Sequence, residues 1–75
     1  MIDILDELQE IYGKVKLTLK TGEVVFGEPD CIVWDEDENE EPIIKKIRFK
    51  IDGKKYAVKF SISEIENFEV IEEYK

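Results

Sequence analysis

Three short segments of this chain place an apolar side chain at every second position. The clearest segment covers residues 14–20, and the same period recurs in residues 46–51 and 55–60. A period of two puts the apolar side chains of a β-strand on one face and the polar side chains on the other. The sequence therefore predicts an antiparallel sheet whose strands are half-buried.

A segment near the N-terminus has the period of a helix instead. Apolar residues recur at three- and four-residue steps within residues 3–12. We expect Asp3 to cap this helix and Gly13 to end it. A helix of about ten residues is marginal alone in water, so it must pack on an apolar surface.

The remaining pattern predicts five short strands, at about residues 14–20, 23–34, 43–51, 54–60 and 66–71. Gly27 and Pro29 interrupt the second strand, which indicates a bulge, a sharp bend or an edge. The Asp52-Gly53 pair predicts a two-residue type I′ turn. Ser63 is expected to cap a short 3₁₀ turn before the last strand.

Side-chain parity along the strands also predicts where the aromatic residues lie. Phe49, Tyr56 and Phe60 have inward parity and are expected in the core. Cys31 is expected to be a small buried side chain, and a single cysteine can form no disulfide within the chain. Trp34 is expected to pack beneath the helix, and the alternative is a partly exposed indole that anchors a partner.

Size and composition are those of one globular domain. The 75 residues make a single domain, residues 1–75, and the 43% of hydrophobic residues is enough for a compact core. No apolar run approaches the ~20 residues needed to span a bilayer. The N-terminus is acidic, whereas a signal peptide begins with basic residues. We therefore expect a soluble, cytoplasmic protein without a membrane partner.

The chain contains no histidine, the commonest general base and metal ligand. Asp35, Asp37 and Asn39 have the spacing that begins a calcium-binding EF-hand loop. However, Glu40 and Lys46 occupy the positions where that loop needs a glycine and a bidentate glutamate. We therefore expect no enzymatic activity, no cofactor and no metal site.

Charge is strongly segregated along the chain, whose net charge is −8. Residues 21–41 contain nine acidic residues and no basic residue, whereas residues 45–60 contain seven basic residues and one acidic residue. Because strand side chains alternate in direction and loops face water, this distribution predicts separate positive and negative surfaces. Such polarity favours binding over catalysis.

A motif in residues 15–27, VKLTLKTGEVVFG, combines alternating apolar residues, a turn glycine and a second glycine in the next strand. This motif, with Ile62, Ile65 and Phe68 near the end of the chain, resembles the Sm-like (LSm) small β-barrel superfamily. The resemblance implies a mainly β fold, a five-stranded, strongly bent antiparallel barrel of the SH3-type or Sm-like kind with an N-terminal α-helix.

The chain also departs from that superfamily. Sm-like RNA binders carry an Asp and an Asn after the second strand and an Arg-Gly pair before the fifth, where this chain has Phe60, Ser61 and Ile62. The uridine-pocket residues are therefore not carried over. Residues 17–23 and 62–68 also resemble, more weakly, the Rho-binding antiterminator family, whose members are acidic Sm-like proteins that bind a protein partner.

The leading hypothesis is a non-catalytic binding module that contacts an unknown protein partner through an acidic surface. Concentrated carboxylates accelerate encounter with a basic partner and suppress wrong partners. The candidate residues are Trp34, Asp35, Glu36, Asp37, Glu38, Glu40 and Glu41.

The alternative is an Sm-like RNA-binding subunit that acts as a homo-oligomeric ring. Strand lysines and arginines would then contact phosphate groups, although they also discourage edge aggregation in ordinary sheets. The candidate residues are Lys14, Lys16, Lys46, Arg48, Lys50, Lys55 and Lys59. In rings of this superfamily the fourth strand of one subunit pairs with the fifth strand of the next. The resemblance therefore implies that these two edge strands form the contact between subunits. Here those strands would carry opposite charges, on Lys54, Lys55 and Lys59 and on Glu64, Glu66, Glu69 and Glu72.

Overall fold

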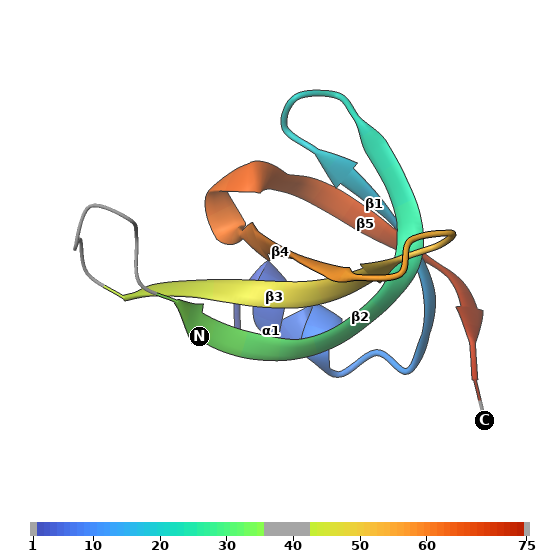
Figure 1. Ribbon diagram of the computed structural model, residues 1–75, viewed down its shortest axis with the longest axis horizontal. Coiled ribbons are helices and arrows are strands. Elements are labelled where there is room, and N and C mark those ends of the chain that lie inside the picture. The colour runs from blue at the N-terminus through green and yellow to red at the C-terminus, as the bar shows by residue number, and fades with distance from the viewer. Residues whose placement is uncertain (1, 36–42, 75) are drawn as a thin grey trace.

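The computed structural model of the protein describes residues 2–35 and 43–74 and has the expected mainly β architecture (Figure 1). Its elements are α1 (Ile4–Gln9), β1 (Gly13–Leu19), β2 (Val24–Asp35), β3 (Ile44–Ile51), β4 (Ala57–Ser61), the 3₁₀ helix η1 (Ile62–Glu64) and β5 (Ile65–Glu73). All five predicted strands and the N-terminal helix are present. The fold is one antiparallel sheet with a short helix packed against β2 and β3.

The strand order in the sheet is β4-β3-β2-β1-β5. The two edge strands, β4 and β5, are joined to each other by η1 and, among the described residues, by no ladder of backbone hydrogen bonds. The sheet is therefore not closed. Figure 1 shows that β2 curves strongly and is shared by both halves of the sheet.

Gly27 is the residue at which β2 passes from one partner strand to the other. Its Cα is opposite Val15 of β1 and also opposite Ile51 of β3. A Cβ atom at this position would collide with the carbonyl oxygen of Lys50 and lie 2.9 Å from the Cα of Ile51. The predicted bend therefore depends on a residue without a side chain.

A β-bulge follows Gly27, as Pro29 predicts. The register passes from Pro29 opposite Phe49 to Ile32 opposite Ile47, so two residues of β2 face one residue of β3. The bulge keeps Pro29 and Ile32 on the inner face and leaves Cys31 exposed. The prediction that Cys31 is buried is therefore wrong, because simple alternation does not hold across the extra residue.

The core lies between the inner face of the sheet and α1. Phe49 and Phe60 are buried there, as predicted, and their rings meet edge to face with centroids 6.1 Å apart. The buried core residues are Leu5, Leu8, Val15, Leu17, Ile47, Phe49, Phe60 and Ile65. The set draws on α1, β1, β3, β4 and β5, while β2 adds the partly buried Val25 and Ile32 at its margin. The helix is therefore held by burial of its apolar side.

Several predicted boundaries differ from the structure. The helix begins after the Asp3 cap as predicted but ends at Gln9, and Gly13 is instead the first residue of β1. Strand β4 begins only at Ala57, so a loop of residues 52–56 replaces the predicted two-residue turn. Ser61, not Ser63, is the N-cap residue of η1.

We predict that Gly27→Ala lowers the free energy of unfolding by about 3 kcal/mol or more, because the added Cβ meets rigid backbone. The matched control is Gly53→Ala. Gly53 has φ +82° but no neighbouring atom within reach of a Cβ, so only the strain of left-handed backbone applies, about 1–2 kcal/mol. Urea unfolding followed by circular dichroism measures both values. Equal losses of unfolding free energy in the two variants would contradict the role of the close backbone contact between Gly27 and β3.

Candidate functional site

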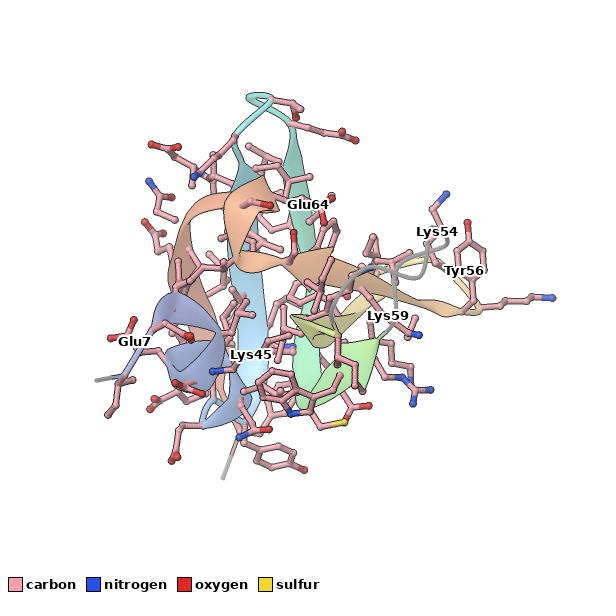
Figure 2. All side chains as sticks on the ribbon, turned by 90° about the vertical axis from the view of Figure 1, so that its left-hand side faces the viewer. Glu7, Lys45, Lys54, Tyr56, Lys59 and Glu64 are labelled. Atoms are coloured by element: carbon pink, nitrogen blue, oxygen red, sulfur yellow. The ribbon has the colours of Figure 1, made fainter. Side chains whose placement is uncertain are left out.

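Acidic residues of α1 and basic residues of the β3–β4 arm lie at different places around the fold. Figure 2 shows Glu7 on α1 at one side, whereas Lys54, Tyr56 and Lys59 project from the β3–β4 arm at the other. Lys45 of β3 lies between these groups, close to the helix. Basic and acidic side chains also form ion pairs with one another, so the separation into positive and negative surfaces stays a prediction.

Lys45 joins the sheet to the N-terminus of α1. Its Nζ atom donates to Asp6 Oδ1 at 2.8 Å and to Asp3 Oδ2 at 3.0 Å. The two aspartates also cap the helix, because Asp3 Oδ1 accepts from the Asp6 backbone N–H at 3.0 Å and Asp6 Oδ2 accepts from the Asp3 N–H at 3.2 Å. One cation therefore bridges both carboxylates of the capping box.

These contacts shift the pKa values of the bridge. The Asp6 backbone N–H and then the Lys45 ammonium group lower the pKa of Asp3 below its usual value of 3.8. Hydrogen bonds to Asp6 and Asp3, in that order, raise the pKa of Lys45 above its usual range. Both shifts favour the charged forms, as expected for an ion pair.

Trp34 lies beside this bridge near the end of β2. Its Cα is opposite Lys45, whose Nζ atom is 6.0 Å from the centroid of the indole ring. The side chain of Trp34 is 64% exposed. The prediction that Trp34 packs beneath the helix is wrong, because its cross-strand neighbour Lys45 makes the polar contacts with α1 in its place.

The acidic run next to Trp34 is only partly described. The backbone of Asp35 ends β2. The other predicted acidic residues of this site, Glu36, Asp37, Glu38, Glu40 and Glu41, lie outside the described residues.

Part of the predicted basic set is brought together on the arm formed by β3 and β4. Arg48, Lys50, Lys55 and Lys59 line one open hollow of about 620 Å³, which we call the basic hollow. Its complete lining is Asp30, Arg48, Lys50, Lys55, Tyr56, Ala57 and Lys59. The cross-strand register places Arg48 directly opposite Lys59. Like charges at such a position repel each other.

Three residues of the basic hollow were not predicted to belong to a site, and two of them, Asp30 and Tyr56, carry polar groups. Asp30 Oδ2 lies 3.7 Å from Arg48 Nε and partly neutralises it. Tyr56 is 63% exposed, so its predicted place in the core is wrong. Tyr56 belongs to the loop of residues 52–56 and precedes β4, so strand parity does not apply to it.

The other predicted basic residues lie elsewhere. Lys14 Nζ pairs with Asp52 Oδ2 at 2.9 Å, which raises the pKa of this lysine above its usual range. Lys16 lies on β1 opposite Glu69, and Lys46 lies on β3 opposite Ser61. Strands β4 and β5 carry fewer of the opposite charges predicted for subunit pairing, because Lys54 and Lys55 lie in the loop before β4 and Glu64 lies in η1.

A second concave surface, which we call the α1 groove, lies between α1 and β5 and has a volume of about 550 Å³. It is lined by Ile2, Asp6, Glu7, Gln9, Glu10, Ile11 and Phe68. Sequence patterns did not indicate this groove, because Phe68 is far from the other residues along the chain. The sequence signal closest to it is the acidic character of the N-terminus.

Tyrosine contacts hold the chain segments that flank the α1 groove. The Tyr74 backbone N–H donates to the Tyr12 carbonyl oxygen at 2.8 Å, and the two rings meet edge to face with centroids 5.3 Å apart. The Tyr74 hydroxyl donates to Glu28 Oε2 at 2.6 Å. This hydrogen bond raises the pKa of Tyr74 to about 12. The end of β5 is therefore fastened to the segment that follows α1.

Within residues 2–35 and 43–74, no three histidine, cysteine, aspartate or glutamate side chains are placed to hold a metal ion. No helix in the same part of the chain is long and apolar enough to cross a membrane. Compared with protein-family models, with curated proteins and with solved structures, the chain matches none of them.

We predict that Lys45→Met lowers stability at neutral pH, and that the loss shrinks as the pH falls through the lowered pKa of Asp3 in the folded protein. Ionised Asp3 stabilises the fold above its unfolded pKa, and this contribution fades as the pH falls through the lower pKa of the folded protein. Urea midpoints measured across the acid range test this expectation. Lys20→Met is the control, because Lys20 is exposed and its side chain makes no ion pair among the described residues. A loss that persists unchanged at acid pH would contradict the ionic origin.

Proposed function

We propose that this chain is a small, non-catalytic binding module that contacts a basic segment of a protein partner through its acidic side. The observation that carries this proposal is the exposure of Trp34, directly before the acidic residues 35–41 in the sequence. An exposed indole is a frequent anchor in protein interfaces. Neighbouring carboxylates increase the rate and the selectivity of association with a basic partner.

The architecture proposed for this module is an SH3-type or Sm-like barrel. The order β4-β3-β2-β1-β5, the bend of β2 at Gly27 and the N-terminal helix support it. A rigid sheet with short loops suits a binding role, because its exposed side chains are held in place before a partner arrives.

A fluorescein-labelled peptide rich in lysine and arginine provides a defined test of the proposed function. We expect the wild-type protein to bind it with an affinity that falls as salt rises. Replacing Trp34 with alanine is expected to weaken binding roughly tenfold, and the triple variant Glu36→Gln, Glu38→Gln, Glu40→Gln by about threefold or more. Fluorescence anisotropy measures these affinities.

The control for the triple variant is Glu23→Gln, Glu69→Gln, Glu73→Gln, which changes the net charge equally at sites away from Trp34. This control is expected to weaken peptide binding less than the triple variant near Trp34 does. Equal affinities for the wild type and all variants would overturn the proposed function.

The basic hollow supports a second candidate function, RNA binding by an Sm-like homo-oligomeric ring. Four cationic side chains and the exposed ring of Tyr56 line the same hollow. Cations bind the phosphate backbone through release of counterions, and an exposed aromatic ring provides a surface on which a base stacks.

Labelled poly-uridine and poly-adenine oligonucleotides test this second candidate. We expect Lys50→Glu with Lys55→Glu to reduce RNA affinity and to flatten its dependence on salt. The control, Lys16→Glu with Lys20→Glu, makes the same change in charge on β1 and the adjoining turn and should have a smaller effect. Light scattering gives the mass in solution. A monomer that binds neither oligonucleotide would contradict this candidate.

A further inference from the structure

The α1 groove exposes apolar surface that the fold does not use. Ile2 is 74% exposed, and Ile11 and Phe68 are half-buried at the margin of the core. The three residues come from the start of the chain, the segment after α1 and strand β5. Apolar surface that remains in contact with water favours a partner that covers it.

The margin of the α1 groove is acidic. Glu7 and Glu10 are exposed, and their carboxylates make no ion pair among the described residues. Glu10 is also the C-cap residue of α1, where the carbonyl groups of the helix already carry partial negative charge, and the last turn contains no basic residue. A cationic group at this end of the helix is therefore favoured.

Asp6 connects the α1 groove with the surface around Trp34. Asp6 lines the groove, and it accepts a hydrogen bond from Lys45, whose ammonium group lies beside the indole ring. Asp6 and Lys45 therefore lie between the groove and Trp34. A single partner segment that extends past these two residues meets both the groove and Trp34.

We propose that the α1 groove binds a cationic peptide segment of the protein partner, with one aliphatic or aromatic side chain placed against Ile11 and Phe68. Lysine or arginine residues on either side of this anchor contact Glu7 and Glu10. The inference rests on the proposed function, because it describes the chemistry of the basic partner segment that the proposed function requires. It adds a requirement for an apolar anchor that charge alone does not impose.

Two labelled peptides test the proposal: a lysine-rich peptide that contains two leucines, and the same peptide with serine in place of each leucine. We expect the leucine peptide to bind the wild-type protein about tenfold more tightly, as burial of a leucine side chain provides. Ile2→Ser is expected to reduce this preference. Val24→Ser is the control, because Val24 is an exposed apolar residue that does not line the groove.

The acidic margin is tested with Glu10→Lys, and Glu23→Lys makes the same change in charge in the turn before β2. We expect Glu10→Lys to weaken binding of the leucine peptide several-fold more than Glu23→Lys does. Circular dichroism and urea unfolding show whether each variant remains folded. Because Ile2, Glu10, Val24 and Glu23 are all exposed, we expect no variant to unfold earlier than the wild type, and a lysine at the helix C-cap stabilises slightly.

The outcomes separate this inference from the proposed function. If both peptides bind equally well and both lysine variants weaken binding equally, general charge attraction is sufficient and the groove proposal is overturned. If neither peptide binds, the proposed function fails as well. If light scattering shows self-association that Ile2→Ser abolishes, a second copy of the chain occupies the groove and the proposal is overturned.

Discussion

The fold depends on the close approach of two backbones at Gly27. One strand, β2, pairs with β1 through its first half and with β3 through its second half, and Gly27 belongs to both ladders. The curvature at this point brings the two halves of the sheet around a common core. The helix, the basic hollow and the α1 groove all take their positions from that curvature.

Much of the fold could be predicted from periodicity. Alternation in residues 14–20 and 46–51 gave the correct inward residues for β1 and β3, because both strands are regular and half-buried. The bend of β2 was also predictable, since glycine and proline have few other uses within a strand. The exposure of Cys31 was not predictable, because only the pairing register of β2 with β3 shows that the bulge includes this residue.

The candidate site was harder to predict, since its members come together only through tertiary contacts. The basic residues were visible in the sequence, but their grouping depends on the register that places Arg48 opposite Lys59. Tyr56 was assigned to the core because the length of the preceding loop was unknown. Trp34 was assigned to the space beneath the helix, but the contacts that Lys45 makes with Asp3 and Asp6 are specific to this fold.

The contact between Tyr12 and Tyr74 joins the two chain segments from which the α1 groove takes Ile11 and Phe68. Tyr12 follows Ile11 directly, and Tyr74 immediately follows β5, the strand that carries Phe68. The hydrogen bond between their backbones therefore links the segment after α1 to the end of β5, and the Tyr74 hydroxyl fixes the same end of the chain to Glu28. A groove whose flanking segments are already joined loses little conformational entropy when a ligand enters. Its affinity for a short peptide then depends mainly on the fit of the anchor side chain.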